Sequence, residues 1–391
     1  MKLNTLDDLE VESKTAIVRV DINSPLDPET GEILDNNRIR MCSETLNELS
    51  DKKAKIVVLA HQGRPASDDF TTLEKHAEEM SRVLDLPVNY IDDLFGPAAR
   101  EEISNLDPGE ILLLENARFY SEEVLNRPAE EQAETHLVRK LSPLADIFVN
   151  DAFAAAHRSQ PSLVGFGVTL PAAAGRLMEK EVEGLGKARN PKHPCVYVLG
   201  GAKVEDSLSL IDHVLGKEIA DQVLAGGLVG QVLLAAKGLD LGKTNMKIIS
   251  EKGYEEELEN AEKLLSTYEE KIALPEDLRV EESEGKAAVV STGELPTENP
   301  VYDIGDETVD EYQKVIEDAK TVVANGPVGV FEKPAFAKGT NGILKALSET
   351  GAFTVIGGGH MVASARELDI VESIDHVSTG GGSCLNFLSG E

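Results

Sequence analysis

Short apolar runs rich in β-branched residues recur along the first half of the chain, separated by stretches whose apolar residues have helical spacing. The expected strands are Ile17–Val20, Lys55–Ala60, Val88–Ile91, Ile111–Leu114 and Ile147–Val149, and the expected helices are Ile39–Leu49, Leu73–Leu84 and Glu130–Leu141. Such alternation is typical of a mostly parallel sheet with helices on its faces. The pattern therefore predicts an α/β fold.

The same alternation continues in the second half. The expected strands are Cys195–Leu199, Gln222–Leu224, Ala287–Ser291, Thr321–Ala324, Phe353–Ile356 and His376–Ser378. The expected helices are Asp206–Leu215, Leu228–Lys237, Tyr254–Tyr268, Glu307–Asp318, Ile343–Glu349 and Met361–Leu368. We expect the acidic stretch Glu276–Gly285 to be an excursion on the surface.

An amphipathic stretch from Pro171 to Ala188 separates the two halves. Proline suits the first turn of a helix, and Asn190-Pro191 ends the pattern. We therefore predict a connector helix over residues 172–189, between an N-terminal domain over residues 1–171 and a C-terminal domain over residues 190–391. Each domain is expected to be a Rossmann-like, three-layer α/β unit. Whether the last residues pack back on the N-terminal domain is left open.

Composition narrows the class of protein. A chain of 391 residues suggests two domains rather than one core. It has 41% hydrophobic residues, no apolar run of about 18 residues and no apolar segment typical of a signal peptide. The three cysteines show neither zinc spacing nor a disulfide framework. We therefore expect a cytoplasmic protein without a membrane span.

The charge balance is strongly acidic, with 70 acidic residues against 38 basic ones and a net charge of −32. Nucleic acids and anionic membranes are therefore poor partners. The acidic residues are dispersed along the chain rather than gathered in one tail. One hypothesis is a salt-rich, halophilic cytoplasm, where molar salt screens self-repulsion. The alternative is an ordinary acidic protein.

Polar and basic side chains follow the expected strands of the first half. Asp21 and Asn23 are two residues apart at the end of one strand, so in extended chain they point the same way. Basic residues open a helix or follow other strands, namely Arg38, His61, Arg64, Arg118, His157 and Arg158. Any single arginine could form a surface salt bridge, but several at one rim of a parallel sheet favour a small anionic ligand.

In the second half, glycines follow the expected strands instead. These loops are Gly200-Gly201-Ala202-Lys203, Gly226-Gly227, Asn325-Gly326-Pro327-Val328-Gly329, Gly357-Gly358-Gly359-His360 and Gly380-Gly381-Gly382. Glycine lets backbone N–H groups approach phosphates, so the pattern indicates a nucleotide site. Neither G-x-G-x-x-G nor a complete Walker A motif is present, although Gly242-Lys243-Thr244 resembles the end of the latter.

An anionic acceptor on one half and a nucleotide on the other together suggest phosphoryl transfer. Closure of an interdomain cleft would exclude water, which otherwise would hydrolyse the phosphoryl donor. His61, His157 and His360 lack the spacing of a metal site, so no residue is predicted to be a metal ligand.

Motifs along nearly the whole chain resemble those of the phosphoglycerate kinase family. They are Arg19-Val20-Asp21-Ile22-Asn23-Ser24-Pro25, His61-Gln62-Gly63-Arg64-Pro65, Glu115-Asn116-Ala117-Arg118-Phe119, Asn150-Asp151-Ala152-Phe153 with Ala156-His157-Arg158, Gly200-Gly201-Ala202-Lys203-Val204, Asn325 to Glu332, and Ser378-Thr379-Gly380-Gly381-Gly382. The resemblance implies reversible transfer from 1,3-bisphosphoglycerate to ADP, giving 3-phosphoglycerate and ATP. Magnesium would be carried by the nucleotide, and we expect a monomer.

The resemblance also implies two binding sets. The substrate-binding set is Asp21, Ile22, Asn23, Arg38, His61, Gln62, Gly63, Arg64, Arg118 and Arg158. The nucleotide-binding set is Gly201, Ala202, Lys203, Gly226, Gly227, Asn325, Pro327, Glu332, Gly358, Gly359, His360 and Met361. Arg38, Lys203 and Gly380 are implied to act on the reacting groups. Because the acceptor is a carboxylate that is already ionised, no general base is required.

Two departures from the usual bacterial and eukaryotic pattern point to the archaeal branch of that family, and a third, at the end of the chain, leaves open how closure is coupled. His360-Met361 replaces Asp-Thr after the triple glycine, and Ser207 stands where a further lysine is usual. The chain also stops soon after Leu388, without the longer tail of many members. Since imidazole is a poor magnesium ligand, His360 could instead contact a phosphate oxygen.

Two other classes of function remain as alternatives. One is an NAD-dependent oxidoreductase, which the missing glycine fingerprint disfavours. The other is a non-catalytic, two-lobed receptor for an anion, which the missing signal peptide disfavours. Turnover in a coupled ATP assay distinguishes both from a kinase.

Overall fold

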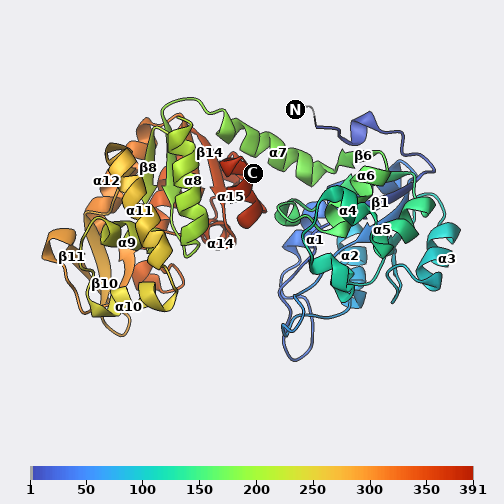
Figure 1. Cartoon of the computed structure of the whole chain (residues 1–391), viewed down its shortest axis with the longest axis horizontal. Coiled ribbons are helices and arrows are strands. Elements are labelled where there is room, and N and C mark those ends of the chain that lie inside the picture. Colours follow the sequence, from blue (N-terminus) through green and yellow to red (C-terminus); the bar gives the residue numbers. More distant parts are fainter. Residues whose placement is uncertain (1–2, 391) are drawn as a thin grey trace. The chain divides into compact units, whose positions relative to one another are not determined.

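The computed structural model describes residues 3–390, which divide into two compact units between Val182 and Glu183. Figure 1 labels their elements along the chain. The division falls inside α7 (Arg176–Arg189), the helix predicted to connect the domains. Each unit is described below by itself.

Unit 1 is built on a six-stranded parallel sheet with strand order β3-β4-β2-β1-β5-β6. The strands are β1 (Thr15–Arg19), β2 (Lys55–Leu59), β3 (Val88–Tyr90), β4 (Ile111–Leu113), β5 (Ile147–Asn150) and β6 (Ala172–Ala174). The helices are α1 (Asn37–Asp51), α2 (Glu74–Leu84), α3 (Pro97–Asn105), α4 (Ala129–Ala133), α5 (His136–Leu141) and α6 (Phe166–Thr169), followed by α7. The parallel α/β architecture predicted from the sequence is therefore confirmed.

Alternate residues of these strands enter two separate cores, one on each face of the sheet. Val18 and Val58 belong to the core that α1 and α2 cover, with Ile39 and Met80 among its members. Ile17 and its register partners Val57 and Phe148 belong to the other core, which α3 and α5 cover. Burial on both faces explains why the strands read as continuous apolar runs.

Unit 2 contains a second six-stranded parallel sheet, with strand order β15-β14-β13-β7-β8-β9. Its strands are β7 (Cys195–Leu199), β8 (Gln222–Ala225), β9 (Ile272–Ala273), β13 (Thr321–Asn325), β14 (Phe353–Gly357) and β15 (His376–Val377). Its helices are α8 (Val204–Gly216), α9 (Gly227–Ala236), α10 (Lys243–Glu251), α11 (Glu255–Tyr268), α12 (Asp306–Asp318), α13 (Lys338–Glu349), α14 (Gly359–Glu367) and α15 (Gly382–Ser389). Within this unit α15 packs on α8.

The second sheet is also buried on both faces. Val196 and Val322 pack with Tyr312 of α12 and Ile343 of α13 in one core. Tyr197, Val323 and Val355, which are neighbours in register, alternate with that set and are buried as well. The sheet is therefore the middle of three layers, as predicted.

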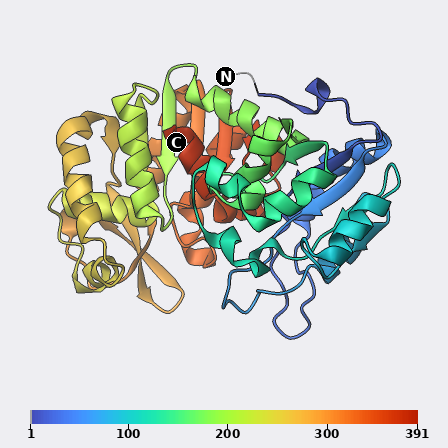
Figure 2. The ribbon, with the colours of Figure 1, turned by 45° about the vertical axis from the view of Figure 1, so that its right-hand side comes forward.

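The acidic stretch Glu276–Gly285 is a strand, contrary to the expectation of a surface excursion. β10 (Asp277–Ser283) pairs antiparallel with β11 (Lys286–Ser291) and β12 (Val301–Ile304) in a small three-stranded sheet. This sheet lies at the end of unit 2 opposite α14 and α15 in Figure 1, and at its lower edge in Figure 2. Leu278 and Val280 alternate with charged residues and are buried. The period of two was present, but the many acids obscured it.

The connector helix predicted over residues 172–189 begins only at Arg176. Ala172–Ala174 forms β6 instead, in register with Phe148, Val149 and Asn150 of β5. Alanine favours helices in isolation, but pairing with the edge of a sheet overrides that weak preference. The predicted helix Glu130–Leu141 is likewise interrupted, because Thr135 between α4 and α5 has an extended backbone.

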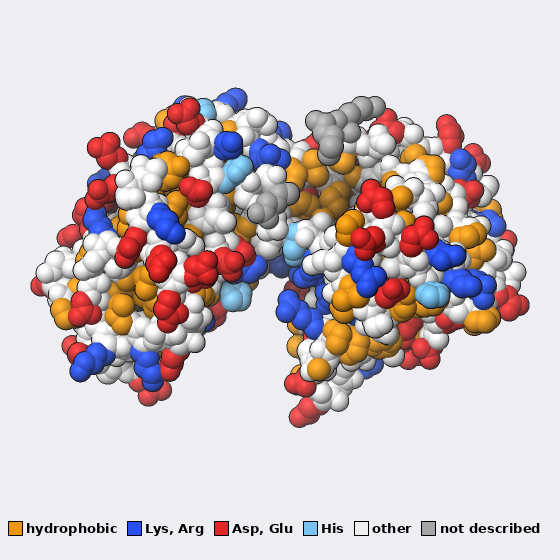
Figure 3. Space-filling model, in the orientation of Figure 1, with side chains coloured by type: hydrophobic (Ala, Val, Ile, Leu, Met, Phe, Trp, Pro, Cys, Tyr) orange, Lys and Arg blue, Asp and Glu red, His pale blue; other side chains and the backbone are white. Residues whose placement is uncertain are grey.

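On the face shown in Figure 3, acidic side chains are scattered over both units, interspersed among basic ones. This agrees with the dispersal of acids along the sequence. No helix among residues 3–390 is long and apolar enough to cross a membrane.

Candidate active-site residues

A buried carboxylate in the loop after β1 lies against a guanidinium group from the first turn of α1 in unit 1. Asp21 is 7% exposed, and its Oδ2 accepts a hydrogen bond from Nη1 of Arg38 at 2.6 Å. Asn23 donates its backbone N–H to Oδ1 of Asp21 at 3.0 Å and accepts the N–H of Gly63 at 2.8 Å on its own Oδ1. Burial opposes ionisation of Asp21, but nearby positive side chains hold its pKa below the ordinary value. Four residues of the predicted substrate set therefore lie together.

Arginines from neighbouring loops gather beside this pair. Arg118, after β4, donates from Nη1 to the carbonyl oxygen of Gly63 after β2. Burial, together with repulsion from Arg158, Arg19 and Arg64, lowers the pKa of Arg118 to about 10. Burial and repulsion from Arg64 also lower the pKa of Arg158. Like charges held this closely are stabilised by an anion, so the cluster suits a ligand with several negative charges.

The positions of these loops follow from the strand order. β4, β2, β1 and β5 are consecutive in the parallel sheet, so their carboxyl ends share one rim. The chain runs from β1 to β2 on one side, whereas β5 lies on the other side of β1. Such a reversal leaves a crevice at the carboxyl ends of the strands, which is where open α/β sheets bind ligands.

Two residues of the predicted substrate set are committed to the fold through their side chains. Gln62 is fully buried; its amide bonds in both directions to the backbone of Ser24 at 2.9 Å, and its Oε1 lies 3.0 Å from Nε2 of His76. Ile22 is fully buried in the core beneath α1 and α2. Any contact of these two residues with a ligand would therefore come from the backbone.

Two further residues of unit 1 support the cluster, although the sequence analysis did not assign them to it. The amide of Asn116 donates to the carbonyl oxygens of Gln62 and Thr71, each at 2.8 Å, and accepts the N–H of Arg118 at 3.1 Å. Arg19 is buried, with Nη2 3.0 Å from Nδ1 of His61. For Arg19, the sequence does contain a signal: a charged residue lies inside an apolar strand, where burial is costly unless the charge is paired.

In unit 2 the glycine loops pack backbone against backbone. Gly201, after β7, donates its N–H to the carbonyl oxygen of Pro327, after β13, at 2.7 Å. Gly227, after β8, has φ +56°, and a Cβ atom there would lie 2.8 Å from the nitrogen of Gly201 and 2.9 Å from the oxygen of Pro327. β8, β7 and β13 are adjacent strands, and the strand order reverses between β7 and β13. Glycine is therefore required at residue 227, because three loops approach one another closely where the strand order of the second sheet reverses.

These loops border a pocket of about 260 Å³. From the predicted nucleotide set, Gly201, Ala202, Gly227, Pro327, Glu332 and His360 line it. The remaining wall was not predicted and consists of Leu228, Gln231, Ile248, Val301, Tyr302, Gly329 and Val330. Several of these side chains come from α9, α10 and β12, elements distant in sequence, so spacing alone could not find them. The wall is largely apolar, with polar groups at few points, as in small-molecule sites.

Polar and flexible groups lie around the opening of this pocket. Nδ1 of His360 is 3.8 Å from Oε1 of Glu332, and both side chains are exposed. Lys203 is exposed, with Nζ 3.8 Å from Oδ2 of Asp206, and a Cβ atom at Gly381 would lie 4.0 Å from the same Nζ. The loops after β7 and β15 therefore approach each other at Lys203.

Other members of the predicted nucleotide set differ in what they can offer a ligand. Met361 is fully buried in the core with Ile343, so only its backbone is available. Asn325 is 7% exposed, and its Nδ2 has no hydrogen-bond partner among the described residues. Gly358 has φ +85° and packs within reach of Gly326 and the side-chain oxygen of Asn325. Gly380 donates its N–H to Oγ of Ser378 at 3.2 Å.

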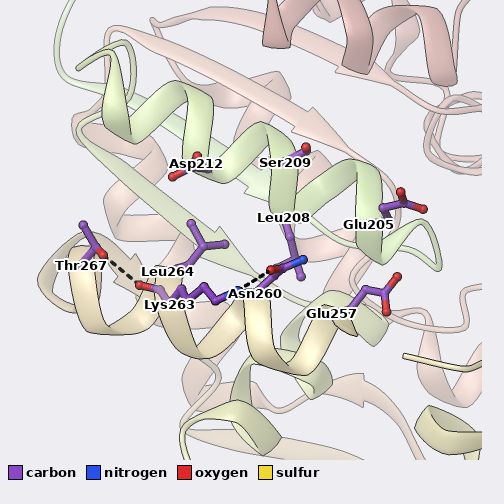
Figure 4. A pocket seen from close by; sticks show the side chains of 9 residues that line it. All are labelled: Glu205, Leu208, Ser209, Asp212, Glu257, Asn260, Lys263, Leu264 and Thr267. Atoms are coloured by element: carbon purple, nitrogen blue, oxygen red, sulfur yellow. Dashed lines mark hydrogen bonds between the residues drawn. The ribbon is translucent and has the colours of Figure 1, made fainter. Parts of the chain in front are cut away.

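A second pocket of unit 2, of about 350 Å³, lies between α8 and α11 (Figure 4). Glu205, Asp212 and Glu257 line it, and Nζ of Lys263 donates to Oδ1 of Asn260 at 3.3 Å. None of the sequence-predicted site residues lines this pocket. Its carboxylates repel phosphate, so the smaller pocket at the glycine loops is the better candidate for a nucleotide.

Across residues 3–390 there is no group of three or more His, Cys, Asp or Glu side chains arranged to hold a metal ion. The cysteines Cys42, Cys195 and Cys384 are buried, and burial raises the pKa of Cys42 and Cys195. Thiolate chemistry is therefore disfavoured at those two residues.

Comparison with known proteins decides the family. A family model described as phosphoglycerate kinase matches residues 6–391. The chain belongs to the phosphoglycerate kinase family. The phosphoglycerate kinase of Methanothermobacter thermautotrophicus is 53% identical over 391 residues, which cover 100% of this chain and 95% of that protein. That of Methanobacterium bryantii is 52% identical over 388 residues, covering 99% and 94%.

Solved structures of phosphoglycerate kinases agree. The crystal structure of the phosphoglycerate kinase from Pyrococcus horikoshii OT3 superposes with a TM-score of 0.93 at 44% sequence identity, covering 100% of this chain and 96% of that one. The structure from Coxiella burnetii gives a TM-score of 0.83 at 32% identity. The chain is thus similar to archaeal phosphoglycerate kinases over its full length, as its departures from the bacterial pattern had indicated.

Membership of the phosphoglycerate kinase family settles the reaction. The protein is a kinase of glycolysis and gluconeogenesis that transfers a phosphoryl group reversibly between 1,3-bisphosphoglycerate and ADP. The predicted family, enzyme class and reaction are confirmed.

Proposed function

We propose that unit 1 binds 3-phosphoglycerate or 1,3-bisphosphoglycerate at the Asp21–Arg38 pair and the arginine cluster, while unit 2 binds ATP or ADP in the pocket at the glycine loops. The observation that carries this division is the gathering of Arg64, Arg118 and Arg158, which follow β2, β4 and β5 along one rim of the sheet of unit 1. A phosphate group presents several oxygens to such guanidinium groups, and each Arg fork binds two of them.

Asp21 and Asn23 are proposed to bind the glycerate part of the substrate. The Asp21 carboxylate accepts a hydrogen bond from the substrate hydroxyl. The side-chain oxygen of Asn23 is already bonded to the N–H of Gly63, so its amide nitrogen is left to donate a hydrogen bond to the substrate. Arg38, about 40% exposed, pairs with Asp21 without a ligand and has unused N–H donors for the reacting carboxylate. These contacts fix the position of the acceptor oxygen, which is what phosphoryl transfer chiefly requires.

The nucleotide is proposed to place its base against the apolar wall and its ribose near Glu332. Leu228, Ile248, Val301 and Val330 provide that wall. The phosphates lie at the glycine loops, where the N-terminus of α14 adds positive potential. The unpartnered Nδ2 of Asn325 is one donor that a phosphate oxygen would satisfy.

Lys203 and His360 are proposed to neutralise charge on the phosphates. Lys203 supplies an exposed ammonium group near Gly381, and His360 lines the pocket beside Glu332. As charge moves from the leaving to the accepting oxygen, such fixed donors stabilise the transition state more than the ground state. The loop at Gly380 is proposed to contribute backbone N–H groups to the same end.

Magnesium fits this site as a companion of the nucleotide rather than as a resident of the protein. The groups around the phosphate loops are mainly nitrogen donors, whereas magnesium prefers oxygen. The ion, bound to phosphate oxygens and water, would neutralise phosphate charge. Activity is therefore expected to depend on magnesium. His360→Asp should lower the magnesium concentration that gives half-maximal turnover, and an unchanged requirement would contradict the place assigned to His360.

Isothermal titration of the full chain with each ligand separately tests the division between the units. Arg118→Ala should weaken 3-phosphoglycerate binding by about ten-fold or more, equivalent to about 1.4 kcal/mol, and leave ADP binding unchanged. The matched control Arg82→Ala removes an exposed guanidinium of unit 1 that pairs with Glu79, and it should change neither affinity. Unaltered 3-phosphoglycerate binding by Arg118→Ala would refute the proposed acceptor site.

The monomeric state and the cytoplasmic location expected from the sequence belong to the same proposal. Light scattering on the purified full chain tests the first, since a dimer would give twice the mass of 42.1 kDa. Imaging a tagged copy of the chain in its native cell tests the second.

A further inference from the structure

A chain of buried polar side chains lies behind the acceptor site and connects the end of β1 with the segments that follow β2, β4 and β5. It runs from Glu123 through Ser162 and Arg19 to His61, which are respectively 0%, 0%, 1% and 3% exposed. Ser162 donates its N–H to Oε2 of Glu123 at 3.1 Å and its hydroxyl to Oε1. Nε of Arg19 donates to Oγ of Ser162 at 2.8 Å, and Nη2 of Arg19 lies 3.0 Å from Nδ1 of His61.

The contact between Arg19 and His61 fixes the proton of the imidazole. A guanidinium group only donates hydrogen bonds, so Nδ1 of His61 must accept and can carry no proton. His61 is therefore neutral, with its proton on Nε2. That N–H has no partner among the residues the structure describes, so it is available to an anionic ligand. A protonated imidazole would turn two donors towards each other and break the contact.

We propose that Glu123 and Ser162 are positioning residues of the acceptor site, which hold Arg19 against His61 so that the imidazole stays neutral and presents Nε2–H to the substrate. The inference rests on the acceptor site proposed above and extends it to residues that do not touch the ligand. Glu123 acts through its charge, since it is the carboxylate with the strongest attraction for Arg19, ahead of Asp21. Burial raises the pKa of Glu123, while Arg19 and the two hydrogen bonds from Ser162 favour its ionised form. Ser162 acts as the bridge between that carboxylate and Nε of Arg19.

A purely structural role for Arg19 would not explain its contact with His61. An arginine that only stabilised the core would satisfy its N–H groups with carboxylate or carbonyl oxygens, as Nη1 of Arg19 does with the carbonyl oxygen of Val20. Nη2 instead meets a ring nitrogen of a residue in the substrate set. Through these hydrogen bonds, Glu123, which follows β4, helps to fix the orientation of His61, which follows β2.

Other charged groups near His61 act in both directions. Burial, with Arg19, Arg118 and Arg158, holds the pKa of His61 well below its ordinary value, whereas the Asp21 carboxylate favours the protonated ring. A bound phosphate would also favour protonation. Arg19 therefore has a specific task, because it opposes the proton that the ligand would otherwise draw onto His61.

The decisive measurement is the tautomer of His61 in the full chain, read by long-range ¹H–¹⁵N NMR of ¹⁵N-histidine-labelled protein. A His61→Gln sample serves only to assign the signals. We expect wild-type His61 to be neutral with the proton on Nε2 from pH 6 to pH 8, with and without 3-phosphoglycerate. A wild-type His61 that titrates in this range, or that carries its proton on Nδ1, overturns the proposal.

Two variants test the residues behind Arg19. Ser162→Ala removes the bridging hydroxyl and Glu123→Gln removes the charge at nearly constant size. In each, His61 should titrate nearer its ordinary pKa of about 6.5, and 3-phosphoglycerate should bind about ten-fold more weakly while ADP affinity stays the same. The control Ser50→Ala removes another buried hydroxyl of unit 1, which donates to the carbonyl oxygen of Gly109 at 2.8 Å, and should leave His61 and both affinities unchanged.

The outcomes separate this inference from the proposed function. If Ser162→Ala keeps the wild-type tautomer and affinity while Arg118→Ala loses 3-phosphoglycerate, the acceptor site stands and the positioning role is wrong. If Arg118→Ala also keeps its affinity, the acceptor site itself is wrong. Should the variants fail to fold, the wild-type tautomer alone still decides whether Arg19 has the stated effect.

Discussion

Replacing Gly227 with alanine should damage the proposed nucleotide pocket through two separate effects. The first is backbone strain, because φ is +56° at this residue. A left-handed conformation costs a residue with a Cβ atom roughly 1 kcal/mol. The second is steric, because the new Cβ atom would lie 2.8 Å from the nitrogen of Gly201 and 2.9 Å from the oxygen of Pro327.

Both of those neighbours are backbone atoms, so no flexible side chain can move aside. The loops after β7 and β13 must separate by some tenths of an ångström, and overpacking of this kind costs roughly 1–3 kcal/mol. We therefore expect Gly227→Ala to lower the free energy of unfolding by about 2–4 kcal/mol. Because the displaced loops line the pocket, ADP affinity should fall by about ten-fold or more.

Gly285→Ala is the matched control. Gly285 lies in the turn between β10 and β11 with φ +72°, and a Cβ atom there meets nothing within 4 Å. It carries the backbone strain without the collision, so it should cost roughly 1 kcal/mol and leave ADP affinity unchanged. The assays are urea unfolding and calorimetric titration with ADP and, separately, 3-phosphoglycerate. Equal ADP affinity in the two variants would refute the steric argument, and loss of 3-phosphoglycerate binding in Gly227→Ala would show a wider disruption than the structure predicts.

Three further predictions concern turnover, acid stability and salt. Arg38→Ala should lower kcat by about 10²-fold or more with the fold intact, whereas Arg40→Ala, two residues away in α1 and bonded to Asn36, should leave kcat near normal. Comparable turnover in the two variants would exclude a role for Arg38 in the reaction. Hydrogen bonding from Arg176 lowers the pKa of Glu48 from 4.5 to about 2, so the stabilisation that ionised Glu48 gives the fold is complete above the unfolded pKa and is lost as pH falls from about 5 to 2. Arg176→Met should remove about 1–2 kcal/mol of this pH-dependent stability, allowing for partial exposure. If the urea midpoint of the variant depends on pH in this range as that of the wild type does, the assignment is contradicted. If the net charge of −32 reflects a salt-rich cytoplasm, molar potassium chloride should raise the melting temperature by several degrees; identical melting curves in dilute buffer and molar salt would exclude it.

The sequence by itself determined the alternation of strands and helices, the parallel sheets and the strand ends at which the candidate site residues lie. Local information suffices for these features. A strand buried on both faces must be apolar along its length, and the loop after it must supply either side chains or glycine for whatever binds there. Asp21, Arg118 and Gly227 could therefore be picked out from their places after apolar runs.

The tertiary structure decided what depends on neighbours distant in the chain. β6 replaced the start of a helix because the edge of β5 was available to pair with it. β10 formed in an acidic stretch because β11 and β12 pair with its two edges. Ile22 and Met361 lie within the sequence motifs of the predicted site, but packing places their side chains in hydrophobic cores. Ile248, Val301 and Tyr302 meet at the proposed nucleotide pocket only after α10 and β12 have packed beside the glycine loops.

The hydrogen-bonded chain from Glu123 through Ser162 and Arg19 to His61 also could not be predicted from the sequence. Its four members are spread over residues 19–162 and no spacing relates them. Sequence can show that a charged residue lies in an apolar strand, because composition is local. Which partner satisfies that charge is set by the strand order β4-β2-β1-β5, which brings the following loops together and makes an otherwise unfavourable burial tolerable.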